Sequence, residues 1–266
     1  MFETIEVVRG SRVAVIWMNR PEVHHAVNEV MVKELTEAMR DASADQEVSA
    51  IVLASRGESF CSGTDLGWYQ RAWHERGQSD DAPDAAFAEL LKVIDDVQVP
   101  VIVRVHGHCV GTGVGLVAAA DIAVASHEAE FTQAETRLGM VPRVVAPYLA
   151  RAIGSRQAGR WLMTGETLSA AEAWRLGLVH EICDASELDA RINGILGHLM
   201  TAELGAVMST RKLVKSLDAG SGQKNASLQV RGDGTTASGG DLAQEGVAAF
   251  LEKRWPAWAP EELKSP

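Results

Sequence analysis

The sequence predicts an α/β fold, and three observations support this prediction. Runs of β-branched and aliphatic residues at 51–53 and 101–103 are each followed by a glycine-bearing loop and then by a helical pattern. Strand-like segments gather in the first half of the chain, whereas the pattern after Arg137 is helical. The chain has 266 residues, of which 46% are hydrophobic, so it can bury a sizeable core.

The first expected elements are a hairpin and a helix. Two β-rich runs over residues 3–9 and 12–18 flank Gly10 and Ser11, which favours a hairpin. A proline follows the second run and ends it, because proline cannot continue a central ladder. From Asn28 onward, apolar residues recur at spacings of four and three, which predicts an amphipathic helix.

The middle of the chain alternates between strands and helices. Residues 78–84 are polar and acidic, which predicts a loop, and the helix after them ends before Pro100. We expect strands over 50–54, 101–105 and 121–125, and helices over 65–75, 84–97 and 113–120.

The second half is expected to be helical. Ser169 and Glu172 have the S-x-x-E spacing of a capping box, which predicts a helix start. Residues 218–240 are rich in Gly, Ser and Asn, which predicts a loop or a poorly ordered segment. We expect helices over 144–153, 155–163, 169–176, 187–200, 202–217 and 242–254.

Charge and cysteine content narrow the function classes. The chain has 25 basic and 36 acidic residues, a net charge of −11, which argues against nucleic acid or an anionic membrane as its main partner. Three cysteines form no paired framework and favour reduced, buried thiols of a cytoplasmic protein. We expect no signal peptide, and no apolar stretch of the sequence is long enough to span a bilayer.

Two glycine-bearing loops, residues 60–66 and 107–115, carry the strongest functional signal. Each follows a buried strand and leads into a helical pattern. Backbone N–H groups at a helix start have no partner within the helix, so they can bind an oxyanion or a phosphate. Two such loops predict a pair of amide donors directed at one developing negative charge.

Other chemistry fits the second loop poorly. Its glycines from Gly111 to Gly115 have G-x-G-x-G spacing, and no acidic residue ends a second strand about twenty residues beyond them, so a dinucleotide site is a poor interpretation. His106, His108 and Cys109 lack the fourth ligand of a zinc site, so no metal is predicted.

A series of motifs runs in order along nearly the whole chain. They occupy residues 19–21, 26–28, 60–66, 107–121, 131–142, 162–166, 170–173, 176–179 and 245–254. Together they resemble the crotonase family, the enoyl-CoA hydratases and isomerases. The segments 113–119, 135–139 and 142–153 look most like its bacterial methylglutaconyl-CoA hydratase-type branch.

The resemblance implies a crotonase-like ββα spiral core over residues 1–195 and a helical C-terminal trimerisation region over 196–266. The expected assembly is a homotrimer or a dimer of trimers. Phe250 and Lys253 then either reach a neighbouring subunit's CoA or cap the terminal helix. We expect the helices after Ser155 at the interface, because their large apolar groups exceed what a short segment buries alone. These groups are Trp161, Leu162, Trp174, Leu176, Leu178 and Ile182.

The resemblance also implies an oxyanion hole and a proton carrier. The carbonyl of a CoA thioester would lie between the backbone amides of Thr64 and Thr112. Hydratases of this family typically use two glutamates; the first of these positions is Gly115 here, and the second is retained as Glu135. Other sources of a second carboxylate, none of which the sequence places, are Glu58, Asp65 and the acidic stretch 80–84.

Residues around both loops are implied to bind the substrate. Trp68, Tyr69 and Trp73 form either the wall of an acyl pocket or helix packing, and we favour the pocket wall. His24 belongs to a region that lines the CoA adenine pocket in relatives, and a solvated loop histidine is an equal alternative. The expected binding residues are His24, Ala26, Ser62, Gly63, Asp65, Leu66, Trp68, Gly111, Phe250 and Lys253.

The expected function is an enzyme of acyl-CoA and fatty acid metabolism that adds or removes water across the α,β double bond of an enoyl-CoA. Coenzyme A is then part of the substrate, and no separate cofactor is expected. The first alternative is a single-glutamate enoyl-CoA isomerase. The second is a CoA-thioester-binding protein with little turnover, for which Gly115 is the only support.

Overall fold

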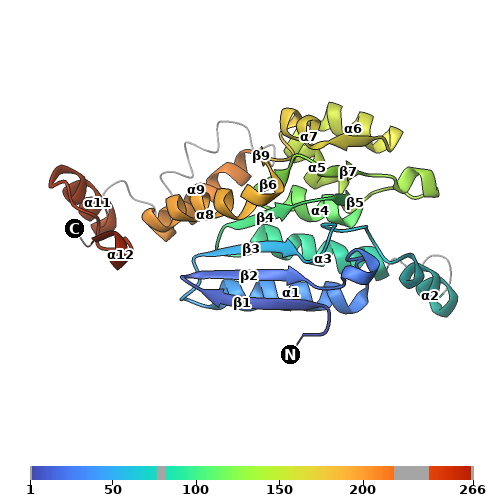
Figure 1. The fold of residues 1–266 in the computed structure, drawn as a ribbon, viewed down its shortest axis with the longest axis horizontal. Helices are drawn as coiled ribbons and strands as arrows, with labels where there is room; N and C mark the ends of the chain where they lie inside the picture. Colours follow the sequence, from blue (N-terminus) through green and yellow to red (C-terminus); the bar gives the residue numbers. More distant parts are fainter. Residues whose placement is uncertain (1, 77–81, 219–239, 265–266) are drawn as a thin grey trace. The chain divides into compact units, whose positions relative to one another are not determined.

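The structure, a computed structural model, describes residues 2–76, 82–218 and 240–264. It confirms the predicted α/β class (Figure 1). The chain divides into two compact units, residues 1–192 and 193–266. Within the described residues, no helix combines the length and the hydropathy needed to cross a bilayer.

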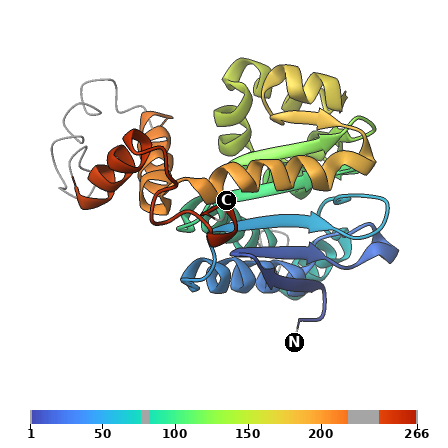
Figure 2. The same cartoon turned by 60° about the vertical axis from the view of Figure 1, so that its left-hand side comes forward.

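A six-stranded sheet organises the first unit, with strand order β1-β2-β3-β4-β6-β9. The predicted hairpin forms its antiparallel edge pair, and every other neighbouring pair is parallel. The strands lie side by side in Figure 1, and Figure 2 shows them turned by 60°. They are β1 (Ile5–Gly10), β2 (Val13–Met18), β3 (Ala50–Ser55), β4 (Val101–Val105), β6 (Ile122–Ser126) and β9 (Glu181–Cys183).

A second, three-stranded sheet was not predicted. It contains β5 (His108–Val110), β7 (Glu130–Thr132) and β8 (Thr167–Ser169), in the order β5-β7-β8. The chain after Arg137, where only helices were expected, therefore also contains the strands β8 and β9. Each of these strands has three residues, which is too short to show a two-residue alternation in the sequence.

Helices pack against one another along the first unit. In α1 (Glu29–Ala44), the side chain of Asn28 caps the start by accepting from Met31 N at 2.9 Å. This helix packs on α3 (Ala82–Asp96), which packs on α4 (Thr112–Ala119). The predicted loop 78–84 is helical from Ala82, and residues 77–81 lie outside the described residues. The remaining early elements are η1 (Pro21–Val23) and α2 (Leu66–Arg76).

The helices that follow β7, up to residue 201, range from three to 14 residues. They are η2 (Glu135–Leu138), α5 (Ala146–Ile153), α6 (Ser155–Thr164), α7 (Ala170–Leu176), η3 (Ala185–Glu187) and α8 (Leu188–Thr201). The predicted capping box of Ser169 and Glu172 is confirmed at the start of α7. Trp161 and Leu178 are buried in the core of their own unit, so they give no support to an interface, whereas Trp174 is 55% exposed.

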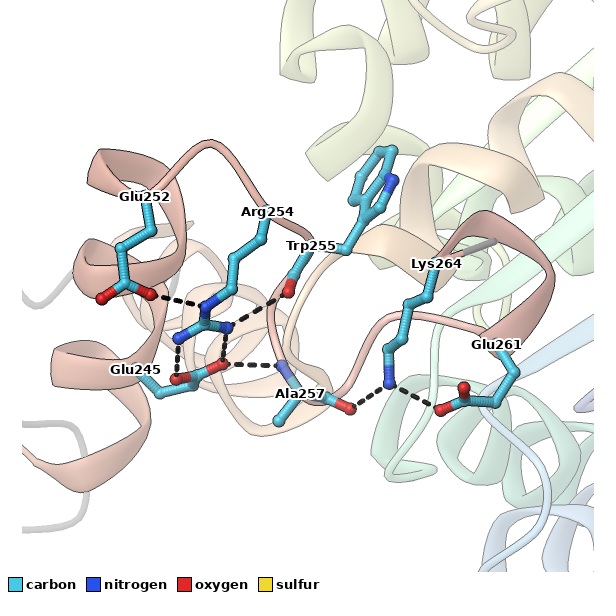
Figure 3. Close-up of polar contacts among 7 residues, drawn as sticks. All are labelled: Glu245, Glu252, Arg254, Trp255, Ala257, Glu261 and Lys264. Carbon is cyan, nitrogen blue, oxygen red and sulfur yellow. Dashed lines mark hydrogen bonds and ion pairs between the residues drawn. The ribbon is translucent and has the colours of Figure 1, made fainter. Parts of the chain in front are cut away.

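The second unit contains α9 (Leu204–Asp218), α11 (Asp241–Leu251) and α12 (Glu261–Lys264), and polar contacts join its last two helices and the segment between them. Arg254 makes a two-bond ion pair with Glu245 at 2.7 and 2.8 Å, and Lys264 donates to the carbonyl of Ala257 (Figure 3). The last predicted helix ends at Leu251 rather than 254. Most of the predicted loop 218–240 lies outside the described residues.

Candidate active site

A pocket in the first unit brings together both glycine-bearing loops. Its space of about 780 Å³, open mouth included, is large enough for an acyl group. Both loops follow parallel strands, β3 and β4, whose carboxyl ends meet at one edge of the sheet. The lining residues are Ser62, Gly63, Thr64, Leu66, Tyr69, Asp84, Phe87, Val110, Gly111, Thr112, Ala134, Glu135, Leu138 and residues 140–145.

The first loop presents an unpaired backbone amide. Gly63 has φ +99°, a left-handed value that glycine adopts without strain. Its carbonyl accepts from Val27 N at 2.8 Å, and Asp65 N donates to the carbonyl of Val27 at 2.9 Å, so the chain on both sides of Thr64 is fixed. Among the described residues, the N–H of Thr64 has no hydrogen-bond partner, and it lies on the lining of the pocket.

The second loop presents a matching amide at the start of α4. Gly111 has φ +53°, and its N–H donates to the carbonyl of Thr132 at 2.9 Å. Thr112 is the first residue of the helix, and its N–H has no partner within the described part of the chain. The positive φ belongs to the glycine before each threonine, so threonine is unstrained at both positions.

Glu135 lies beside both loops with one oxygen unpaired. Its Oε1 accepts from the side-chain amide of Gln133 at 2.8 Å, while Oε2 is buried without a partner in the described structure. A Cβ atom added to Gly111 would lie 3.3 Å from Oε1 of Glu135 and 3.6 Å from Cα of Gly63, so the three residues meet. Burial, and secondarily the charge of Asp84, raise the pKa of Glu135 above its ordinary value.

No side chain extends from α4 at Gly115, the first of the two positions at which a glutamate was considered. A Cβ atom added there would lie 3.0 Å from Cγ2 of Val145 and 3.1 Å from two ring atoms of Phe87. The ring of Phe87, on α3, therefore fills the space in front of this glycine.

Of the acidic residues named as a second carboxylate, Asp84 lines the pocket. Glu58 is exposed and Asp65 pairs with Arg20 at 3.8 Å; neither lines it. Asp84 accepts a short hydrogen bond from the hydroxyl of Tyr69, which also lines the pocket.

His24 and Ala26 support the first loop and do not line the pocket. The carbonyl of His24 accepts from Ser62 N at 2.9 Å, and its Nδ1 lies 3.2 Å from Oγ of Ser59. The carbonyl of Ala26 accepts from the guanidinium of Arg20. Their proposed contact with CoA stays a prediction.

The expectation that Trp68 lines the pocket is corrected by the structure. Its side chain is 6% exposed and packs in the hydrophobic core, whereas Leu66 and Tyr69 face the pocket. Leu66 and Tyr69 are three residues apart and therefore lie on the same face of the helix, which lines the pocket. Trp68, next to Tyr69 in the sequence, lies on a different face. Trp73 packs on Tyr69 with ring centroids 5.6 Å apart.

Sequence reasoning missed one wall of the pocket. Residues 138–145, from the end of η2 to the start of α5, supply apolar groups such as Leu138 and Val141 together with Arg143. Residues 139–143 have no helical or alternating pattern, so the local sequence does not place their side chains. Phe250 and Lys253 belong to the second unit, and their predicted contact with CoA stays a prediction.

The cysteine and histidine side chains in and near the two loops make other contacts. Burial raises the pKa of the Cys61 thiol to about 11, so it is neutral and a poor nucleophile at pH 7. Nε2 of His106 lies 2.8 Å from the carbonyl of Gly57, whereas Nδ1 of His108 pairs with Glu130 at 3.3 Å.

Comparison with known proteins gives a consistent result. The sequence profile of the family "Enoyl-CoA hydratase/isomerase" matches residues 9–261. A protein of Rhodobacter capsulatus named "Probable enoyl-CoA hydratase" is 32% identical over 96% of this chain and 97% of its own. A Streptococcus mutans protein named "Trans-2-decenoyl-[acyl-carrier-protein] isomerase" is 29% identical over 92% of this chain and 93% of its own.

The fold is shared with solved structures. The crystal structure of an enoyl-CoA hydratase from Shewanella pealeana superposes with a TM-score of 0.90 at 28% identity. The match covers 97% of this chain and 96% of that one.

Proposed function

Because the chain belongs to the enoyl-CoA hydratase/isomerase family, whose members are enzymes, we propose that it adds water to, or removes water from, the α,β double bond of an enoyl-CoA. One observation carries the proposal. Thr64, Thr112 and Glu135 line the same pocket, and within the described residues the N–H groups of both threonines and the buried Oε2 of Glu135 have no hydrogen-bond partner.

The two amides act on the thioester carbonyl. When water adds to the β carbon, negative charge develops on the carbonyl oxygen as an enolate forms. Preorganised N–H donors stabilise such charge at little reorganisation cost, and one donor is typically worth about 10²–10³ in rate. The loops that hold Thr64 and Thr112 are fixed by the backbone bonds of Val27, Gly63 and Gly111 before substrate arrives.

Glu135 moves the proton of the α carbon. Its raised pKa keeps a larger fraction of the carboxyl protonated near neutral pH than an exposed glutamate would have, and the protonated form is the one that donates. The hydrogen bond from Gln133 fixes Oε1 and so orients the carboxyl group beside Gly111 of the second loop.

The second candidate is double-bond isomerisation. Gly115 favours it, because moving a proton between two carbons needs one carboxylate and no held water. The Streptococcus mutans relative is named as an isomerase, although its substrate is named as an acyl-carrier-protein thioester.

A panel of three substrates distinguishes the candidates. Crotonyl-CoA, a 3-enoyl-CoA and methylglutaconyl-CoA are incubated with the enzyme, and the products are identified by mass spectrometry. A 3-hydroxyacyl-CoA from crotonyl-CoA or methylglutaconyl-CoA is the expected result. Conversion of the 3-enoyl-CoA alone would replace hydration by isomerisation, and binding without any product would reject both.

We also propose that the enzyme works in the cytoplasm as a trimer or a dimer of trimers, with coenzyme A as part of the substrate and no other cofactor. The second unit supports assembly, since its described helices expose many large apolar groups that a second copy could cover. They include Leu213, Val214, Leu217, Leu242, Val247, Phe250 and Leu251. Three free, buried cysteines agree with a reducing compartment.

A further inference from the structure

A second carboxylate lines the pocket from a helix that the family motifs do not include. We propose that Asp84, held by Tyr69, binds the attacking water and takes its proton, while Glu135 delivers the proton to the α carbon. The proposal rests on the hydratase function above. It assigns the binding of water to a residue of α3, because α4 has glycine instead of glutamate at position 115.

Contacts at the pocket place Asp84 for this role. Asp84 and Glu135 both line the pocket. The hydroxyl of Tyr69 donates to Oδ1 of Asp84, and within the described residues Oδ2 has no partner. An ionised carboxylate with one oxygen fixed and one unpaired can accept from a water molecule. The charge of Asp84 also contributes to raising the pKa of Glu135, which places the two carboxyl groups within electrostatic reach.

The same face of α3 accounts for Gly115. Phe87 follows Asp84 by three residues, so the two side chains share a face of the helix. Phe87 occupies the space in front of Gly115, where a Cβ would lie 3.1 Å from its ring. The helix α3 thus fills, with Phe87, the space that a glutamate on α4 would need. The same helix carries a carboxylate, Asp84, about one turn earlier.

A purely structural role explains Asp84 less well. A carboxylate in the first turn of a helix stabilises the helix by its interaction with the helix dipole, whatever the side chain contacts. That role needs neither a partner on α2 nor a place on the pocket lining. Asp84 has both, because Tyr69 reaches it from the other helix of this wall.

The proposed step is balanced. The water oxygen forms a bond to the β carbon, and one of its protons passes to Asp84. The π electrons of the double bond move toward the thioester, the amides of Thr64 and Thr112 stabilise the enolate oxygen, and the protonated Glu135 gives its proton to the α carbon. Asp84 has gained one proton and Glu135 has lost one, and exchange with solvent restores both.

The test separates water activation from proton transfer at the α carbon. Hydration of crotonyl-CoA needs both carboxylates, whereas exchange of the α protons of butyryl-CoA with D₂O needs the oxyanion hole and Glu135 only. We expect Asp84→Asn to lower the hydration rate by about 10²–10⁴, the usual cost of one general base, and to change the exchange rate far less. Tyr69→Phe keeps the ring and releases the carboxylate, so we expect a smaller loss confined to hydration.

Asp96→Asn is the matched control, because Asp96 ends the same helix, pairs with Lys92 and does not line the pocket. It should hydrate like wild type. Asp84→Asn that hydrates at nearly the wild-type rate, or that loses hydration and exchange equally, would overturn the role of Asp84. A wild-type enzyme that exchanges α protons and hydrates no enoyl-CoA would instead reject the proposed hydratase, before any variant is made.

Discussion

Two walls of the pocket carry chemical groups in different ways. The Glu135 wall, residues 131–139, forms a short strand and a 3-10 turn that hold one glutamate between Gln133 and the second loop. The Gly115 wall consists of α4 and the facing start of α3. There α4 has no side chain at Gly115, the ring of Phe87 occupies the space in front of that glycine, and Asp84 and Phe87 of α3 line the pocket.

The difference shows how a function can move between elements. A carboxylate missing from one helix can be replaced by a carboxylate on the helix packed against it. This requires that the replacing carboxylate and the side chain that fills the empty space lie on the same face of the second helix. Asp84 and Phe87 meet this condition, because they are three residues apart. The following predictions test whether the Glu135 wall carries proton transfer and whether the Gly115 wall depends on tight packing.

The largest effect is expected at Glu135. Glu135→Gln keeps the shape and the bond to Gln133 but removes the proton carrier, so kcat for hydration should fall by about 10²–10⁴. Affinity for butyryl-CoA, measured by calorimetry, should change little. Glu130→Gln is the control, because this exposed residue lies five positions away on β7 and pairs with His108. Near wild-type turnover by Glu135→Gln would remove the Glu135 wall from the mechanism.

The next effect concerns packing at the Gly115 wall. Gly115→Ala inserts a methyl group against Val145 and Phe87, and overpacking of this kind typically costs about 1–3 kcal/mol of unfolding free energy. The same contacts oppose the larger Gly115→Glu, although that change would return a carboxylate to α4. Urea unfolding measures the loss.

Gly159→Ala supplies the opposite case. Gly159 lies within α6 and has no atom within 4 Å of an added Cβ, so alanine should stabilise the helix by about 0.5–1 kcal/mol. Equal stability of the Gly115 and Gly159 variants would show that α3 leaves more room than the structure gives it.

A smaller effect is expected outside both walls, at Phe250 and Lys253. If these residues complete a neighbour's CoA site, Lys253→Ala and Phe250→Ala should raise KM by up to about fivefold and leave kcat unchanged, because they do not touch the reacting carbons. Lys212→Ala, an exposed lysine on α9, is the control. Light scattering over a dilution series should show a trimer or hexamer. A fully active monomer would leave Phe250 and Lys253 without this role.

The smallest effect is on the pH dependence of stability. Because burial raises the pKa of Glu135 in the folded state, the wild-type protein is favoured at low pH, where this carboxyl is protonated. That contribution is lost as the pH rises through the raised pKa. Glu135→Gln stays neutral, so its unfolding free energy relative to wild type should increase from pH 4 to pH 8. A constant difference would mean that the pKa of Glu135 is ordinary.

Much of the fold could be predicted from local patterns. The apolar runs of β3 and β4, the helix expected from Asn28 and the capping box of Ser169 and Glu172 each depend on a few neighbouring residues, and all three are confirmed. The three-residue strands β5, β7, β8 and β9 were not predicted, because they are defined by pairing with a distant strand and not by a pattern in the sequence.

The site divides in the same way. Gly63, Thr64, Thr112 and Glu135 belong to motifs and were named in advance, and all of them line the pocket. Asp84 was one of several acidic candidates, and its selection depends on the packing of α3 beside α4, which no local pattern encodes. The orientation of Trp68 into the core depends likewise on what covers the other face of α2.

The proposed hydration is tested most directly by isotopes in the product of one reaction. Wild-type enzyme is given crotonyl-CoA in a mixture of H₂¹⁸O and D₂O, and the product is analysed by mass spectrometry. We predict 3-hydroxybutyryl-CoA with ¹⁸O on the β carbon and deuterium on the α carbon, formed about 10²–10⁴ times more slowly by Asp84→Asn and by Glu135→Gln. Deuterium in a shifted double-bond isomer without ¹⁸O, or no product at all, would contradict the two-carboxylate account.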